Sequence, residues 1–77
     1  MDINDFIKNF AAQFDETDES VFTAQTKFRE ELGEWDSLLA LSVIAMVDTE
    51  YNVTIKGDDI KSSTTIEDLY NIVKSKK

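Results

Sequence analysis

The stretch Gly33-Glu34-Trp35-Asp36-Ser37-Leu38 leads directly into the longest apolar run of the chain, Leu38 to Val47. This run contains a single serine and continues to Tyr51. Its apolar residues recur at helical spacing, and aspartate and serine both favour the N-cap of a helix. The sequence therefore predicts a long apolar helix that begins near Asp36 and carries the hydroxyl group of Ser37 at its N-terminal end.

The spacing within this helix predicts which side faces the core. The inward stripe is expected to contain Leu38, Leu41, Ile44, Ala45, Val47 and Tyr51. A helix that is apolar on nearly every side cannot be buried all round in so small a domain. The partner-facing residues are therefore predicted to be Leu39, Ser42, Val43, Met46, Asp48 and Glu50. The two acids oppose the helix dipole, which fits either a partner-facing role or acids that are merely tolerated there.

An amphipathic pattern also opens the chain. The apolar residues at helical spacing are Ile3, Phe6, Ile7, Phe10, Ala11 and Phe14. They predict a helix over residues 3–15, capped by Asp2 or Asn4, whose phenylalanines belong to the core.

In residues 16–36 the apolar side chains do not recur at a regular helical or strand spacing. The side chains expected to pin this long connection to the helices are Val21, Phe22, Phe28 and Leu32. A short helical turn is predicted around Thr26–Leu32, and Gly33 would end it. The acids near Asp15 to Glu19 lack the glycine and the terminal glutamate of a calcium loop, so we interpret them as solvated and predict no metal site.

The C-terminal third completes the predicted fold. Residues 52–57 form a connector with Val53 or Ile55 turned inward, and residues 58–61 can form one helical turn. A capping box from Thr64 to Glu67 would begin a last helix. Its apolar side chains are Ile66, Leu69, Tyr70 and Val73, and its end is suited to Lys74 and Lys76. Strand signals are weak, so the sequence predicts one all-α domain over residues 1–77, a bundle of three main helices and one short helix.

The composition excludes several function classes. The 77 residues contain no cysteine and no histidine, so cysteine nucleophiles, zinc–thiolate sites and the commonest general base are missing. Sixteen acids against eight bases give a net charge of −8. Such a charge disfavours nucleic acid and anionic membranes and favours partners with basic patches. The start of the chain lacks the basic region of a signal peptide, and the apolar run is too short to cross a bilayer, so we expect a cytoplasmic monomer that is not an enzyme.

Ser37 is the residue best placed to carry chemistry. The unpaired N–H groups and the positive dipole end of a helix favour a phosphate at this position. A simple N-cap by Asp36 or Ser37 explains the same residues. Taken alone, the Asp-Ser-Leu triplet does not decide between the two interpretations.

The wider pattern Phe28-x-x-Glu31-Leu32-Gly33-x-x-Asp36-Ser37-Leu38 resembles the acyl carrier protein family. Chain length, acidity, the long first connection and the closing Thr65-Ile66-Glu67-Asp68-Leu69 are also similar. The resemblance implies that a phosphopantetheinyl transferase attaches 4′-phosphopantetheine from coenzyme A to Ser37, with Asp36 and Leu38 in its recognition motif. It further implies that the thiol of the arm carries acyl groups as thioesters between enzymes of fatty acid biosynthesis or a related branch of lipid metabolism.

The chain departs from the common fatty-acid type of that family at several positions. An extra residue lies in the Glu34-Trp35 segment, Leu39 and Ser42 replace acids that are frequent there, and Ser63 replaces an apolar residue that often closes the acyl pocket. These differences favour a specialised carrier, for polyketide, aminoacyl or surface-glycan assembly. The candidate lining of an acyl pocket is Ile44, Val47, Tyr51, Ile55, Ile60 and Tyr70, all of which also fit a simple core role.

A function from another class also fits the pattern. An acidic helical adaptor or inhibitor could use the apolar helix to bind a basic partner without any prosthetic group. The intact mass after treatment with a transferase and coenzyme A distinguishes the two.

Overall fold

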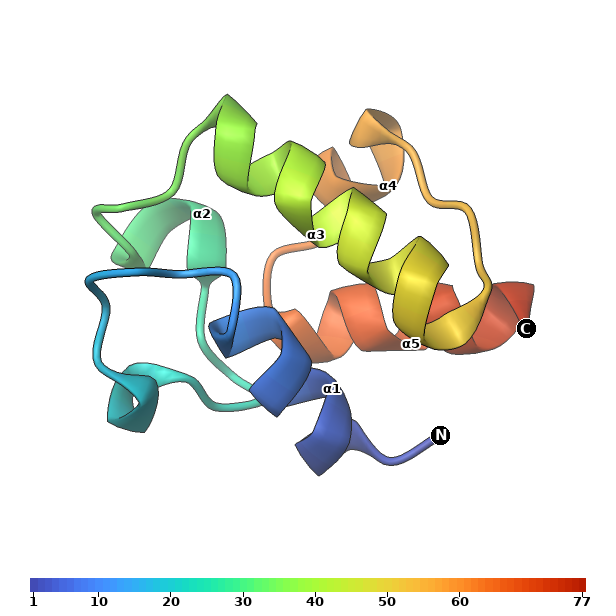
Figure 1. The fold of residues 1–77 in the computed structure, drawn as a ribbon, viewed down its shortest axis with the longest axis horizontal. Helices are drawn as coiled ribbons and strands as arrows, with labels where there is room; N and C mark the ends of the chain where they lie inside the picture. The colour runs from blue at the N-terminus through green and yellow to red at the C-terminus, as the bar shows by residue number, and fades with distance from the viewer.

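The computed structural model describes all 77 residues and contains helices but no strand. The chain forms three longer helices, two short ones and one 3₁₀ turn, arranged in space as in Figure 1. In chain order they are α1 (Ile3–Ala11), the turn η1 (Glu19–Val21), α2 (Phe28–Glu31), α3 (Ser37–Tyr51), α4 (Gly57–Lys61) and α5 (Ile66–Lys76). The prediction of an all-α bundle with three main helices is confirmed.

The first helix, α1, ends earlier than its apolar pattern predicts. Asp2 caps its N-terminus by accepting a 2.9 Å hydrogen bond from the N–H of Asn4. The helix stops at Ala11, and the N–H of Phe14 bonds to the Ala11 carbonyl at 3.0 Å in a tighter turn. Phe14 stays buried although it lies outside the helix. The early end lets the chain turn toward Glu34, whose carboxylate accepts the N–H of Asp15.

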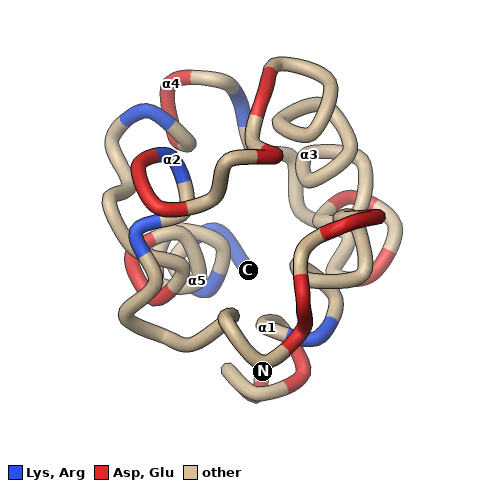
Figure 2. The backbone as a smooth tube through the Cα atoms, turned by 90° about the vertical axis from the view of Figure 1, so that its left-hand side faces the viewer, with Lys and Arg blue, Asp and Glu red and all other residues tan.

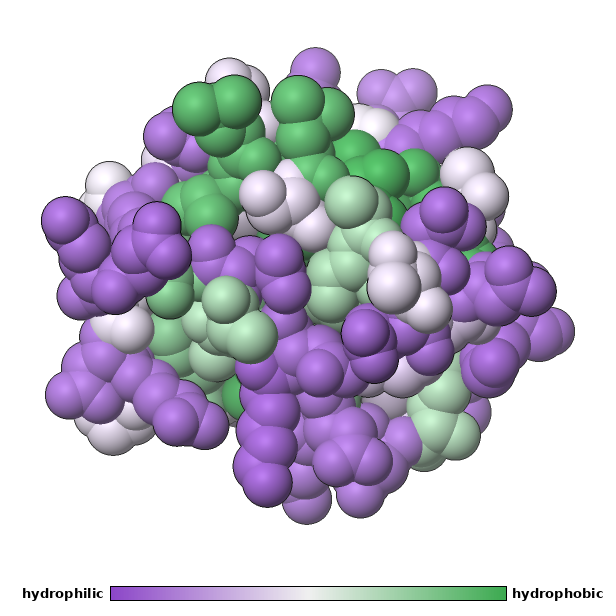
Figure 3. Space-filling model, viewed as in Figure 1, coloured by the Kyte–Doolittle hydropathy of each residue, from purple (hydrophilic) through white to green (hydrophobic).

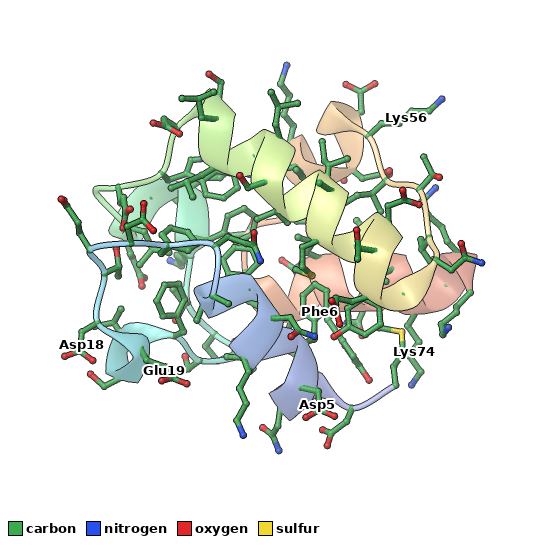
Figure 4. The ribbon with its side chains drawn as sticks, viewed as in Figure 1. Asp5, Phe6, Asp18, Glu19, Lys56 and Lys74 are labelled. Atoms are coloured by element: carbon green, nitrogen blue, oxygen red, sulfur yellow. The ribbon has the colours of Figure 1, made fainter.

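Aromatic side chains make up the centre of the core. Phe10 is fully buried, and its ring lies 5.2 to 6.5 Å from the rings of Phe6, Phe14, Phe22, Phe28 and Trp35, measured between centroids. Tilted and edge-on pairs at such separations add about 0.5–1.5 kcal/mol each beyond area burial. In Figure 4 the side chain of Phe6 lies among α1, α3 and α5. The phenylalanines are thus core residues, as the sequence predicts.

The faces of α3 differ from the prediction. Its buried residues are Val43, Met46 and Val47, whereas Leu38 and Leu41 are 71% and 62% exposed. Leu39 is partly buried and packs against the core, so it does not lie off the inward face. The predicted inward stripe is therefore wrong for Leu38, Leu41 and the exposed Ala45. The prediction that Val43 and Met46 face a partner is wrong as well, because both are covered by the core.

The long connection before α3 is held to α5 through backbone hydrogen bonds. The N–H of Ile66 bonds to the carbonyl of Thr26 at 3.1 Å, and that of Glu67 bonds to Ala24 at 3.0 Å. Two N–H groups at the start of α5 are thereby satisfied by a distant loop. Phe22, Phe28 and Leu32 are buried as predicted. Val21 is 46% exposed, so it does not pin the loop, because η1 turns it toward solvent.

The segment between α3 and α5 is also tightly capped. Asn52 ends α3 in the left-handed conformation with φ of 56°, which asparagine tolerates better than most residues. Val53 and Ile55 are both buried, whereas the sequence predicted only that one of the two would face inward. The capping box of α5 joins Thr65 and Asp68 rather than Thr64 and Glu67. The predicted box is off by one residue because Asp68 accepts the N–H groups of both Thr64 and Thr65.

The charges are distributed so that few acids are neutralised. The one ion pair joins Lys76 to Asp59 at 3.8 Å. Figure 2 shows acidic residues on every side of the tube, and Figure 4 shows Asp18 and Glu19 at the outer edge of η1. No group of acids is arranged to hold a metal ion. The surplus of eight negative charges is therefore left to solvent and counterions.

This surplus predicts a salt-dependent stability. The melting temperature should rise on addition of sodium chloride, because screening shortens the range of the repulsion. Magnesium at equal ionic strength should raise it further. A Glu30→Gln, Glu31→Gln variant, changed only on the exposed side of α2, should melt higher at low salt and respond less to salt. A melting temperature that is flat in both salts would contradict the prediction.

Candidate functional site

Ser37 is the first residue of α3, and the local structure leaves its hydroxyl group free. Asp36 occupies the N-cap and accepts the N–H of Leu39 at 2.8 Å. The side chain of Ser37 is exposed and makes no hydrogen bond, and the N–H groups of Ser37 and Leu38 donate to no protein group. Since Asp36 performs the capping, capping does not explain the serine. The site combines an accessible hydroxyl, two free N–H groups and the positive end of a 15-residue helix.

An apolar surface lies beside this hydroxyl. Leu38 and Leu41 are the two most exposed large apolar side chains of the protein. In Figure 3 green atoms gather over the part of the molecule where α3 runs. Exposed leucines so close together are typical of a surface that another protein covers.

A groove of about 340 Å³ opens next to Ser37, between the start of α3 and α4. We call it the α3–α4 groove. It is lined by Arg29, Trp35, Asp36, Ser37, Ala40, Gly57, Ile60 and Lys61. The sequence analysis did not single out Arg29, Ala40, Gly57 and Lys61, because the lining residues come from separate segments of the chain.

The segment before Ser37 is supported by two residues whose roles the sequence did not reveal. The carboxylate of Glu34 accepts three hydrogen bonds, from the N–H of Asp15 at 3.0 Å, the N–H of Glu16 at 3.1 Å and the hydroxyl of Thr17 at 2.7 Å. The indole of Trp35 stacks on Phe10 at an angle of 6° and meets Phe28 edge-on. The extra residue marked this segment as unusual in the sequence. The hydrogen bonds of Glu34 could not be predicted from it, because their partners lie about twenty residues away.

The hydrogen bonds to Glu34 predict an acid-sensitive contribution to stability. The Thr17 hydroxyl, followed by the Asp15 and Glu16 N–H groups, lowers the pKa of Glu34 below its ordinary 4.5, while burial opposes the shift. A lowered pKa means that the stabilisation is complete above about pH 4.5 and is lost as the pH falls through the folded-state value. Glu34→Gln should therefore lower the urea midpoint at neutral pH, with the gap to wild type closing toward pH 3. A gap that is equal at both pH values would contradict this role.

The residues predicted to line an acyl pocket do not surround a cavity. Val47, Ile55 and Ile60 are buried in the closed core. Tyr51 and Tyr70 lie near the other end of α3, where both rings pack against Phe6. Of the six candidates only Ile60 lines a groove, the α3–α4 groove. Their core role is confirmed, and the structure gives no support to a deep acyl pocket.

The remaining predicted partner residues are placed unevenly. Asp48 and Glu50 are exposed, and Ser42 is partly exposed. Leu39 is partly buried, as described above, and leaves less surface to a partner than Leu38 does. The exposed apolar side chains of α3 are therefore the leucines that the sequence placed in the core.

Comparison with known proteins identifies the class of this chain. A family model described as phosphopantetheine attachment site matches residues 5–73, nearly the whole length. The chain is accordingly a carrier protein and not an enzyme. It belongs to the phosphopantetheine attachment site family, and its prosthetic group is 4′-phosphopantetheine. No curated protein and no solved structure matches the chain significantly.

The surroundings of Ser37 fit such a group. A phosphodiester needs an accessible hydroxyl for attachment, and its oxygens accept hydrogen bonds from N–H groups like the free ones at this helix end. No helix is both long enough and apolar enough to cross a membrane.

Proposed function

We propose that this protein tethers acyl intermediates on a 4′-phosphopantetheine arm attached to the hydroxyl group of Ser37 and carries them between enzymes. The observation that carries the proposal is the free, exposed hydroxyl at the first position of α3, with the cap supplied by Asp36 instead. A rigid helix end presents the arm in a defined direction, away from the core.

The residues of this chain have a limited part in the attachment itself. The oxygen of Ser37 attacks the phosphorus of coenzyme A that bears pantetheine, a new O–P bond forms, and the bond to the adenosine-bearing phosphate breaks. The chain contains no histidine, so the base that takes the serine proton belongs to the transferase. The free N–H groups of Ser37 and Leu38 would be the groups that donate hydrogen bonds to the attached phosphate. When bound, the arm supplies the thiol that holds the cargo.

The partner surface is proposed to be the exposed side of α3. Leu38 and Leu41 form its apolar part, and Asp48 and Glu50 form an acidic part further along the helix. A transferase or an acyl-handling enzyme with an apolar spot flanked by arginine or lysine fits this arrangement. Asp36 and Leu38 would belong to the surface that the transferase recognises.

The cargo is proposed to be short, in a specialised pathway such as polyketide, aminoacyl or surface-glycan assembly. The supporting observation is the closed core, in which the candidate pocket residues leave no cavity for a long acyl chain. An adaptor without a prosthetic group is not favoured, because the family match covers nearly the whole chain.

Intact-mass measurement tests the attachment. The purified apo protein is incubated with coenzyme A and a broad-range phosphopantetheinyl transferase, and then digested. The protein should gain the mass of one phosphopantetheine group, located on the peptide that contains Ser37. A protein that stays unmodified while a known carrier in the same tube is modified would overturn the proposal.

A further inference from the structure

The α3–α4 groove has a local charge opposite to that of the protein. Two cations, Arg29 and Lys61, and one carboxylate, Asp36, line it. One net positive charge therefore remains at the groove, although the whole chain carries −8. In Figure 2 the blue segments of α2 and α4 lie on the same side of the molecule, next to red segments of the same two helices. Neither cation forms an ion pair with an acid.

Arg29 is held in place by hydrogen bonds to carbonyl groups. Its Nε donates to the carbonyl of Ser63 at 3.2 Å, and its Nη2 donates to the same carbonyl at 2.7 Å and to that of Lys61 at 3.0 Å. These bonds leave the charge of the guanidinium unneutralised and hold it against the carbonyl groups at the C-terminal end of α4. A cation that is held in advance loses little side-chain entropy when an anion arrives.

The rest of the groove is apolar. Trp35, Ala40 and Ile60 contribute to its lining. One face of the indole is occupied by the phenylalanine cluster, so its remaining exposed part contributes to the groove. The groove is thus lined by two cationic residues and by apolar side chains.

We propose that the α3–α4 groove holds the proximal part of the phosphopantetheine arm, with Arg29 and Lys61 at the phosphodiester and Trp35 and Ile60 against the dimethyl-bearing carbon that follows it. The inference rests on the proposed attachment to Ser37. Ser37 lines the same groove, and the phosphorus would be one bond from its oxygen, so the phosphodiester would lie at the groove that both cations line. Asp36 would repel the phosphodiester, and the cations offset that repulsion. The arm would then leave the protein along α4.

The single tryptophan of the chain provides the measurement. Apo and holo forms of each variant are prepared, their loading is verified by intact mass, and quenching of Trp35 fluorescence by acrylamide is compared. In the wild type, quenching should fall by roughly half on conversion to the holo form, because the exposed part of the indole becomes covered. Lys61→Met and Arg29→Gln should reduce or abolish this protection although both load fully.

Two features of the design separate the possible outcomes. Lys61→Met leaves the backbone carbonyl that Arg29 contacts in place, so it tests the charge even where Arg29→Gln weakens folding. Lys56→Met is the matched control, because Lys56 belongs to the same short segment, points away from the core in Figure 4 and does not line the groove. It should retain full protection.

Equal quenching of fully loaded holo protein and apo protein would overturn the inference while leaving the proposed function intact. Full protection in holo Lys61→Met would overturn the assignment of that cation. Absence of any mass gain would overturn the proposed function, and the inference with it.

Discussion

Ser37→Ala should accept no phosphopantetheine at all under conditions in which the wild type is fully converted. The hydroxyl oxygen of Ser37 is the atom that would form the bond to phosphorus, and no other hydroxyl of the chain stands at the start of a long apolar helix with its cap supplied by a neighbour. The expected loss is therefore complete rather than partial. Intact mass reports it directly.

The fold should survive this substitution. Asp36 keeps the hydrogen bond to Leu39, and alanine is a better helix former than serine by a few tenths of a kcal/mol. The melting temperature should therefore stay at or slightly above that of the wild type. Ser42→Ala, changed one turn further along α3, is the control and should load normally. A Ser37→Ala protein that still gains the mass would place the attachment elsewhere and refute the proposed site.

Phe10→Ala should remove a large part of the stability of the domain. Phe10 is fully buried and its ring contacts five other aromatic rings, so the substitution opens a cavity that the remaining side chains cannot fill. Such a change costs about 3–5 kcal/mol. Typical stabilities of about 0.05–0.15 kcal/mol per residue give a chain of this size about 4–12 kcal/mol in total. The urea midpoint of the variant, followed by circular dichroism, should therefore fall far below that of the wild type.

Val21→Ala is the control for this prediction. The sequence pattern places Val21 among the residues that pin the long connection, but its side chain is 46% exposed. Exposed substitutions of this kind usually change stability by less than about 0.5 kcal/mol. Comparable losses from Phe10→Ala and Val21→Ala would show that the aromatic cluster is not the centre of the core.

The helices themselves could be predicted from local sequence because each is encoded within its own residues. The pattern of phenylalanines in α1, the Asp36–Ser37 start of α3 and the apolar face of α5 all act over one or two helical turns. The errors at the helix ends have one local cause and one distant cause. The capping box shifts by one residue because Asp68 serves two N–H groups, and α1 ends early because Glu34 binds the chain that follows it.

The inward face of α3 could not be predicted in the same way. Its apolar residues occupy nearly the whole circumference of the helix, so their spacing does not identify which side faces the core. Leu38 and Leu41 lie on one side of α3, and Val43, Met46 and Val47 lie on the other. The side that faces inward was decided by the core that packs against α3, to which α1 contributes. The exposed apolar side chains of α3 are for this reason Leu38 and Leu41, and not the residues that the sequence predicted to face a partner.

The sequence by itself determined the class of fold, the net charge, the absence of histidine and cysteine, and the position of Ser37 at the start of the longest helix. These features depend on composition or on neighbours a few residues apart. Only the tertiary structure decided the faces of α3, the three hydrogen bonds to Glu34 and the groove in which Arg29 and Lys61 meet Ser37. The physical reason is that the contacts join distant parts of the chain. The hydrogen bonds of Glu34 and Arg29, for example, join residues 17 to 34 positions apart, so no local period or motif encodes them.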